Sequence, residues 1–298
     1  MIISASRRTD IPAFYTDWFM NRIRAGFAAV RNPFNARQLR PVSLAVADVD
    51  AIVFWTRNAR KLIPHLTDLD LLGYRYYFQY TITGYPTALE KSVPGLDQAV
   101  RTFAELSERI GSQRVLWRYD PILLSNLTTI DEHLRRFEKI AAALAGKTSR
   151  VTISVAEFYQ KTRKNLGRVE GLTCTDLAQD RGQLQALVAS LAGIAAQHGM
   201  EMRTCASGID LANVGVSPGK CVDEHRLKTV FGSNYPSAKD KGQRPHCNCV
   251  PSVDIGAYNT CLHGCAYCYA THNSRIAVDN MARHDPKSPL LVGQPPDE

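Results

Sequence analysis

The chain has 298 residues, of which 45% are apolar and 21% charged. This composition excludes a disordered chain, a collagen-like repeat and a small disulfide scaffold, and it allows one large domain or two ordinary ones. Basic residues outnumber acidic ones by 36 to 28, a net charge of +8, which favours anionic partners such as phosphates, nucleic acid or a carboxylate substrate. No stretch resembles a signal peptide or a membrane span. We therefore expect a cytoplasmic protein without membrane contact, whose cysteines are reduced thiols or metal ligands.

The first two thirds of the chain alternate between predicted strands and predicted helices. The predicted strands, rich in β-branched and aromatic residues, are Ile2–Ser6, Ala51–Trp55, Tyr74–Ile82, Arg114–Tyr119, Val151–Val155 and Met200–Cys205. Helical spacing is found in Tyr15–Val30, Ala59–Leu66, Leu96–Ile110, Ile130–Ala145 and Asp176–His198. Gly146 and Gly199 stand where helix C-caps are expected. Strands that alternate with helices predict a parallel sheet, either a partial or complete (β/α) barrel or an open doubly wound sheet.

Polar residues at the strand ends favour the barrel. In a (β/α) barrel the carboxyl ends of all strands converge on one face, which carries the chemistry. The polar residues at these ends are Arg7, Arg8, Thr9, Asp10, Thr56, Arg57, Asn58, Thr81, Thr83, Arg118, Asp120, Glu157, Thr204 and Cys205.

We predict that Arg118, Asp120 and Glu157 act on the substrate, because an arginine at a strand end can bind a carboxylate or phosphate through two hydrogen bonds. The alternative is an ion pair of Arg118 with Asp120 or Glu157 inside the barrel. A basic run follows the fifth strand, at Lys161, Arg163, Lys164 and Arg168. Such a run is usually a solvated face, although it can also track a nucleic-acid backbone.

The cysteines gather near the end of the chain. Of the eight, seven lie between Cys205 and Cys268. From about Gly208 to Val253 helical periodicity is lost, which predicts a long irregular loop held by a cluster or metal. We expect a barrel body over 1–207, a cysteine-rich region over 208–278 that completes the barrel, and an extended or disordered tail over 279–298.

Cys261, Cys265 and Cys268 form a CxxxCxxC motif. Three thiolates at this spacing can hold a [4Fe–4S] cluster and leave its fourth iron open to a small molecule. The alternative is structural zinc with His263 or His272 as the fourth ligand, although structural zinc sites usually pair their cysteines as CxxC.

A second set consists of Cys205, Cys221, Cys247 and Cys249. These four thiols are enough to ligate a second [4Fe–4S] cluster or one zinc ion. We prefer the auxiliary cluster, and zinc or free thiols remain alternatives. Cys174 stands alone and is interpreted as an inert thiol.

The run Cys-Leu-His-Gly-Cys-Ala-Tyr-Cys-Tyr-Ala at 261–270 resembles the cluster loop of the radical S-adenosylmethionine superfamily, with Tyr267 as its aromatic residue. Its details resemble members related to spore photoproduct lyase. Val253–Tyr258 resembles the first barrel strand of those enzymes. The whole chain is similar to an uncharacterised family with an N-terminal Ser-Arg-Arg-Thr-Asp and a C-terminal cysteine cluster. Because the cluster loop lies near the C-terminus instead of the N-terminus, the resemblance implies a circularly permuted barrel.

The resemblance also implies a reaction and its binding residues. One electron, from a donor such as a flavodoxin or ferredoxin, would cleave S-adenosylmethionine on the open iron, and the 5′-deoxyadenosyl radical would take hydrogen from an unidentified, anionic substrate. The superfamily's Gly-Gly-Glu segment is absent. The segment from Ser4 to Asp10 is expected to replace it, with Asp10 on the ammonium group, Arg7 or Arg8 on the carboxylate, and Tyr267 beside them.

Two other functions remain open at this stage. One is an iron–sulfur protein that binds or repairs nucleic acid, which the positive charge favours. The other is a non-enzymatic module that binds zinc or a cluster.

Overall fold

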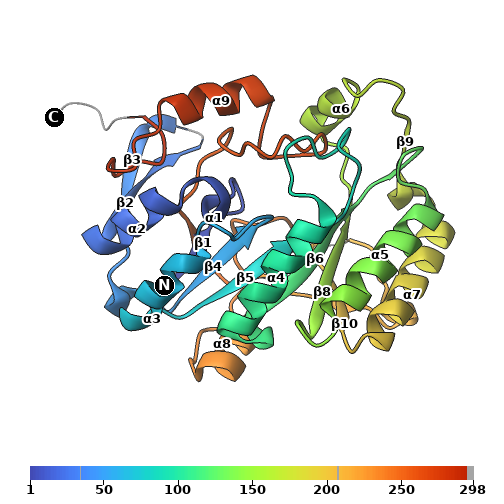
Figure 1. Cartoon of the computed structure of the whole chain (residues 1–298), viewed down its shortest axis with the longest axis horizontal. Helices are drawn as coiled ribbons and strands as arrows, with labels where there is room; N and C mark the ends of the chain where they lie inside the picture. The colour runs from blue at the N-terminus through green and yellow to red at the C-terminus, as the bar shows by residue number, and fades with distance from the viewer. Residues whose placement is uncertain (34, 207, 294–298) are drawn as a thin grey trace.

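The computed structural model describes residues 1–33, 35–206 and 208–293. Its centre is an eight-stranded sheet in the order β11-β10-β8-β6-β5-β4-β1-β12 (Figure 1). All neighbouring strands in this sheet are parallel. The strands are β1 (Ile2–Ala5), β4 (Ala51–Thr56), β5 (Tyr76–Thr81), β6 (Val115–Ile122), β8 (Arg150–Val155), β10 (Glu201–Thr204), β11 (Ser217–Pro218) and β12 (Val253–Asp254).

The predicted parallel sheet and its six main strands are confirmed, and the fold is mixed α/β. Closure into a barrel is not confirmed: in the described part of the chain, β11 and β12 are the two ends of the sheet and do not pair with each other. β1 pairs with β4 on one side and with β12 on the other. The first strand of the chain therefore lies beside the strand that leads into the CxxxCxxC motif.

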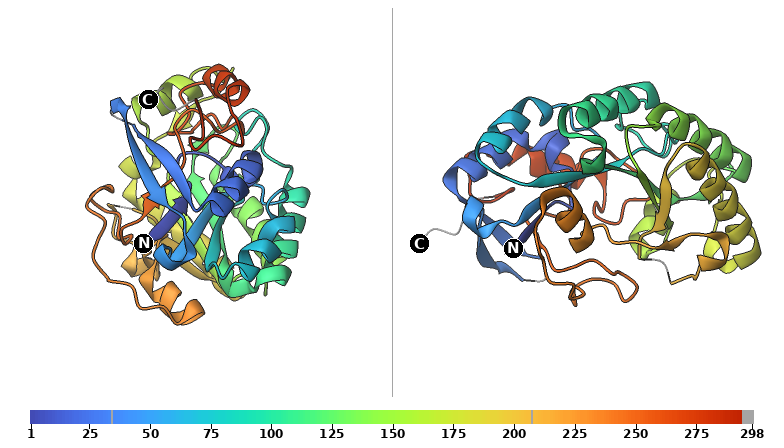
Figure 2. Two further views of the ribbon diagram at one scale, coloured as in Figure 1. Left: turned by 90° about the vertical axis from the view of Figure 1, so that its left-hand side faces the viewer. Right: turned by 90° about the horizontal axis from the view of Figure 1, so that it is seen from below.

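The two faces of the sheet are covered differently (Figure 2). Along one face lie α2 (Thr16–Ala25), α3 (Leu66–Leu71), α4 (Leu96–Ile110), α5 (Ile130–Leu144) and α7 (Arg181–Gln197). Phe54, Phe78 and Trp117 are buried in the core on this side. The alternate residues Val53 and Tyr77 form a second core with the segment around α8 (Glu224–Phe231). Successive residues in a strand point to opposite faces, so a strand buried on both sides feeds both cores.

Several predicted helices match the structure. The helix predicted over Leu96–Ile110 has those bounds, and the one over Ile130–Ala145 ends one residue earlier. Gly146 and Gly199 have φ of 74° and 71°, the left-handed conformation expected just past a helix end. The helix predicted over Asp176–His198 begins only at Arg181, because Asp180 caps it.

Two helix predictions were partly wrong. Tyr15–Val30 is helical only to Ala25, because Gly26 adopts φ of 73° and the chain turns into β2 (Phe27–Asn32). This strand pairs antiparallel with β3 (Asn35–Ser43). Over Ala59–Leu66 the chain forms only a short 3-10 helix, Ile63–His65, before α3 begins.

The other short elements are α1 (Ile11–Phe14), α6 (Gln160–Leu166), α9 (Ser274–Ala282), β7 (Leu124–Ser125), β9 (Cys174–Thr175), and 3-10 turns at Val46–Asp48, Ser112–Arg114, Leu177–Gln179 and Ala212–Val214.

The segment after α9 packs against the N-terminal part of the chain. The Trp18 indole N–H donates to the Ser288 carbonyl at 3.0 Å, and Leu290 and Leu291 are buried. Residues 279–282 of the predicted extended tail are instead the end of α9, residues 283–293 form this packed segment, and residues 294–298 lie outside the described residues. None of the helices in the described ranges is long and apolar enough to cross a lipid bilayer.

Candidate functional site

The carboxyl ends of the parallel strands surround a cavity of about 1040 Å³. Its wall contains seven cysteines from both predicted sets: Cys205, Cys221, Cys247, Cys249, Cys261, Cys265 and Cys268. Residues in and just after the carboxyl-terminal parts of β1, β4, β6 and β8 complete the wall. Cys174, interpreted as inert, is not in this wall. Most of the predicted strand-end residues line this cavity, whereas Asn58, Thr83 and Thr204 do not. Ligand sites of parallel sheets form at this edge.

The CxxxCxxC loop is closed at its base by Asn259. This residue adopts φ of 60°, its N–H donates to the Ala270 carbonyl at 2.9 Å, and its side-chain oxygen accepts from the His272 N–H at 2.6 Å. Inside the loop the Ala270 N–H donates to the Cys268 sulfur at 3.3 Å. Burial raises the pKa of the Cys265 thiol to about 12. A backbone N–H aimed at sulfur stabilises a thiolate, the form that binds iron.

His263 fastens this loop to the sheet. It is buried, its Nε2 lies 2.7 Å from Oδ2 of Asp10, and its Nδ1 lies 3.3 Å from the Ser92 carbonyl oxygen. With both ring nitrogens engaged, His263 has none left for a metal. His272 is exposed and lies outside the cavity wall. Neither histidine is therefore placed as the fourth ligand that the zinc alternative requires.

Asp10 lines the cavity, but its carboxylate is already occupied. Oδ1 accepts from the Ala13 N–H at 3.0 Å and from the Thr56 hydroxyl at 2.7 Å, and Oδ2 accepts from the Arg57 N–H at 2.7 Å and faces His263. These four contacts use the acceptor positions of a carboxylate. Asp10 thus joins two strand ends and the cysteine loop, and it offers no free oxygen for the ammonium group expected there.

Ser4 also differs from its expected role, because it does not line the cavity. Its hydroxyl donates to Oδ2 of Asp254 at 2.9 Å and accepts from the Trp55 indole N–H at 3.1 Å. Asp254 accepts three further hydrogen bonds, from the Ser6 hydroxyl at 2.6 Å, the Arg7 N–H at 2.8 Å and the Gly256 N–H at 3.0 Å. Ser4 therefore orients the Asp254 carboxylate at the end of β12. Sequence reasoning missed Asp254, although a lone carboxylate in an apolar run just before the motif was a usable signal.

Tyr267 is held by a buried charge network. Its hydroxyl donates to the Glu90 carboxylate, which pairs with Arg57 at 2.9 Å. Burial raises the pKa of Tyr267 well above its usual value, so the phenol stays protonated. This network fixes the ring of the motif's aromatic residue against β4. Glu90 was not identified from the sequence, because nothing in its local pattern marks it.

The second cysteine set comes together from three separate segments. The sulfurs of Cys205 and Cys221 are 3.3 Å apart. The Cys249 sulfur accepts from the backbone N–H groups of Cys221 at 3.3 Å and Val222 at 3.4 Å. A hydrogen bond from Cys221 and the nearby charge of Arg118 lower the pKa of Cys205 to about 7, although burial opposes them. The pKa of Cys249 is lowered as well, whereas the pKa values of Cys221 and Cys247 are raised, so negative charge in this set is favoured on the sulfurs of Cys205 and Cys249.

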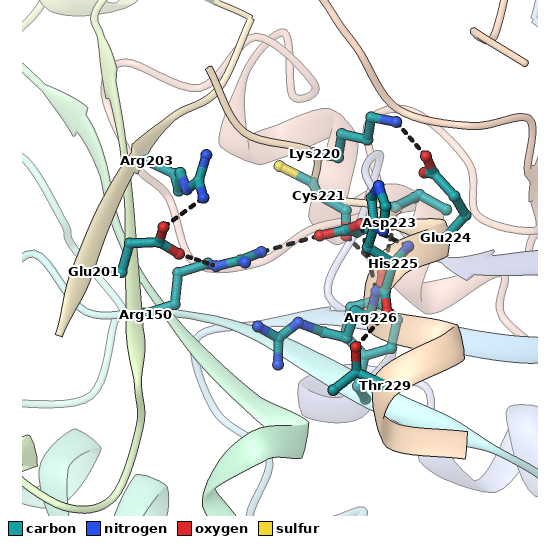
Figure 3. A network of polar contacts seen from close by, with 12 residues as sticks. Arg150, Glu201, Arg203, Lys220, Cys221, Asp223, Glu224, His225, Arg226 and Thr229 are labelled. Atoms are coloured by element: carbon teal, nitrogen blue, oxygen red, sulfur yellow. Dashed lines mark hydrogen bonds and ion pairs between the residues drawn. The ribbon is translucent and has the colours of Figure 1, made fainter. Parts of the chain in front are cut away.

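A polar network fixes the segment that carries Cys221 (Figure 3). The Cys221 carbonyl accepts from the Tyr77 hydroxyl at 2.7 Å and the Gln79 amide at 2.8 Å. Asp223, two residues later, caps α8 and pairs with Arg150 at 3.0 Å. These contacts tie the loop to β5 and β8, so the thiol position is set by strands and not by the loop alone.

Two arginines flank the second set. Nη1 of Arg118 lies 2.8 Å from the Cys221 sulfur, and its Nη2 pairs with Asp120. The guanidinium groups of Arg7 and Arg118 lie 5.0 and 5.1 Å from the Trp55 ring centre. Nη2 of Arg7 is buried with no hydrogen-bond partner within the described residues. A buried guanidinium N–H without a partner is costly unless negative charge faces it.

The predicted catalytic residues all line the cavity, but as ion pairs. Arg118 pairs with Asp120, which also accepts from the Ser154 hydroxyl. Glu157 pairs with Arg244 instead of Arg118. The alternative of an ion pair between Arg118 and Asp120 is therefore what the structure has.

The sequence profile of the family described as "Domain of unknown function (DUF1848)" matches residues 2–270. The chain belongs to this family. No curated protein matches the sequence. The predicted similarity to an uncharacterised family is thus confirmed, and the match covers the sheet and both cysteine sets of this DUF1848 chain.

In the ranges that the structure of this DUF1848 chain describes, no three His, Cys, Asp or Glu side chains are arranged to hold a single metal ion. A structural zinc site needs four donors about 2.0–2.3 Å from one point. Thiols that bind a four-iron cluster need not converge in this way, because each one binds a different iron.

Proposed function

We propose that this protein is a radical S-adenosylmethionine enzyme on a circularly permuted, partial (β/α) barrel. The observation that carries the proposal is the placement of the CxxxCxxC loop. It follows β12, the neighbour of β1, and its three thiols line the cavity at the carboxyl edge of the sheet. This is the position expected if β12 acts as the first barrel strand.

The three thiols suit a [4Fe–4S] cluster with one open iron. Cys261, Cys265 and Cys268 are the thiols on this loop, and both nitrogens of the nearby His263 are engaged elsewhere. A fourth iron would therefore lack a ligand from the loop. When bound, such a cluster would supply the electron that splits S-adenosylmethionine into methionine and a 5′-deoxyadenosyl radical.

The chain's own residues would orient the cofactor and shield it. Because Asp10 is saturated, the buried Thr9 hydroxyl, which lines the cavity without a partner in the described residues, is the better acceptor for the ammonium group. Arg7 points toward Ser252, 3.1 Å away, and toward the second cysteine set, so it does not serve the carboxylate. The network of Tyr267, Glu90 and Arg57 closes the wall behind Cys265.

We assign the second cysteine set to a fully ligated auxiliary cluster. Four thiolates on a four-iron core leave net negative charge, and the buried cations of Arg7 and Arg118 would compensate it. The unpartnered Nη2 of Arg7 supports this assignment, because its partner would be a thiolate or a cluster sulfide. The N–H groups aimed at Cys249 support it as well.

Anaerobic reconstitution with iron and sulfide, followed by reduction and addition of S-adenosylmethionine, tests the proposal. We expect 5′-deoxyadenosine from the wild type and none from Cys265→Ala. Cys174→Ala is the matched control and should retain the activity, because Cys174 lies outside the cavity wall. A protein with intact clusters that forms no 5′-deoxyadenosine would contradict the enzyme assignment.

A further inference from the structure

Three exposed tyrosines stand at the cavity. Tyr159, Tyr258 and Tyr269 line it with exposed fractions of 44%, 39% and 51%. They come from separate segments: the start of α6, the turn after β12 and the end of the cysteine loop. Aromatic rings that gather on one open surface usually mark a binding site, since burial would otherwise stabilise them.

Two cations lie over one of these rings. The Arg8 guanidinium is 5.2 Å from the Tyr258 ring centre, and Nζ of Lys161 is 5.8 Å from it. Neither cation forms an ion pair with a carboxylate in the described part of the chain. Of the carboxylates in the cavity wall, Asp120 pairs with Arg118 and Glu157 pairs with Arg244. Asp10, Asp240 and Asp254 accept hydrogen bonds from within the protein. The cavity wall thus presents two cations, Arg8 and Lys161, that have no ion-pair partner within the described residues.

Further cations continue this surface away from the cavity. Arg163, Lys164 and Arg168 follow Lys161 on and after α6, and all are exposed. The whole chain carries a charge of +8. A small carboxylate would need the cations but not three aromatic faces. A nucleoside phosphate uses both, because bases stack on tyrosine and phosphates bind Arg and Lys.

We propose that the substrate of the cavity is a nucleotide within a single-stranded nucleic acid. Its bases would stack on the rings of Tyr258, Tyr159 and Tyr269, and its phosphates would contact Arg8 and Lys161, which would turn from the face of the Tyr258 ring to the phosphates. A single strand fits better than a duplex, because only unstacked bases can offer their faces to tyrosine rings. This inference rests on the proposed function, since it names the substrate class for the same cavity.

The test measures binding separately from catalysis. A fluorescent oligonucleotide of about 12 nucleotides, within the usual size of single-strand sites, is titrated with the anaerobically loaded full chain at about 50 to 200 mM salt. We expect Tyr258→Leu to weaken binding about ten-fold through lost stacking. Tyr258→Phe should bind like the wild type, and unchanged thermal unfolding midpoints would show that both variants are folded.

The cations are tested through the salt dependence. The double variant Arg8→Gln/Lys161→Gln should make the slope of log affinity against log salt shallower by about 1.4, because each single-strand phosphate contact contributes about 0.7. The matched control, Lys61→Gln/Arg101→Gln, removes the same charge from exposed residues outside the cavity wall. It should leave the slope unchanged.

Three results would overturn the inference: no binding at low salt, equal competition by base-free polyphosphate or a mononucleotide, or full affinity in Tyr258→Leu. Equal affinity for a duplex of the same sequence would overturn the single-strand assignment. The two proposals fail separately. Formation of 5′-deoxyadenosine without oligonucleotide binding contradicts only this inference. Binding without 5′-deoxyadenosine contradicts the proposed enzyme and makes the nucleic acid a ligand of the cavity instead of its substrate.

Discussion

Replacing Asp10 with asparagine tests how the cysteine loop is held. An asparagine oxygen can still accept from the Ala13 N–H and the Thr56 hydroxyl. Its NH₂ group, however, would face the Arg57 N–H, which Oδ2 of Asp10 now accepts at 2.7 Å. That buried donor would be left without an acceptor, and the charge-assisted contact to His263 would weaken. An unsatisfied buried donor costs about 1–3 kcal/mol and a hydrogen bond to a charged group contributes about 1.5–3 kcal/mol. We therefore expect Asp10→Asn to lower the free energy of unfolding by about 3 kcal/mol.

The assay is urea unfolding followed by circular dichroism, together with iron per chain after reconstitution. Asp17→Asn is the matched control, because it removes the same charge from an exposed position in the first turn of α2. Its effect should stay within about 0.5 kcal/mol. If the cysteine loop holds the proposed cluster, Asp10→Asn should also retain less iron, since His263 ties this loop to the carboxylate. Equal stability and iron content in the two variants would refute the role given to Asp10.

Three further predictions concern other parts of the chain. Burial lowers the pKa of His133 to about 4, so the contribution of this histidine to stability is full above its usual pKa of about 6.5 and is lost as the pH falls toward 4. Between pH 7.5 and 5.5 the free energy of unfolding measured in urea should fall by about 1.3 kcal/mol more in the wild type than in His133→Gln. An identical fall in the two proteins would contradict this. Arg118→Gln should make the midpoint potential of the proposed auxiliary cluster more negative in an EPR titration, because it removes a neighbouring positive charge. Arg118→Lys keeps that charge and should have a midpoint potential close to the wild-type value. An unchanged potential in Arg118→Gln would argue against Arg118 as a compensating charge. Leu291→Ala, at a residue 3% exposed, should lower the free energy of unfolding by about 3 kcal/mol. Val278→Ala, at a residue 57% exposed, should lower it by less than about 0.5 kcal/mol. Equal effects would mean that the segment after α9 is not packed against the N-terminal part.

The strands and the edge that carries the site could be predicted from local sequence. β4 is a continuous apolar run up to Trp55, and β5 is interrupted only by Gln79 before it ends at Thr81. Both faces of these strands are buried, and such runs are typical of parallel strands. The polar residues after them mark the cavity edge for the same reason that loops carry function. Clustering in the sequence identified the seven cysteines that line the cavity.

Contacts that depend on distant residues could not be predicted. The apolar spacing of 15–30 continues through the point where Gly26 ends α2, so periodicity alone could not distinguish the β2–β3 hairpin from a helix. The local sequence does not show that the Asp10 carboxylate is occupied, because its partners Thr56 and His263 lie far from it along the chain. Glu90 becomes part of the site only because Arg57 and Tyr267 lie against it.

The central claim is that the cysteine loop holds an iron–sulfur cluster with one open iron. EPR spectroscopy of the anaerobically reduced protein, combined with iron and sulfide analysis, tests it most directly. We predict about eight irons and eight labile sulfides per chain, and a cluster signal that changes when S-adenosylmethionine is added and is missing in Cys265→Ala. Zinc without labile sulfide, or a cluster signal that S-adenosylmethionine leaves unchanged, would contradict the claim.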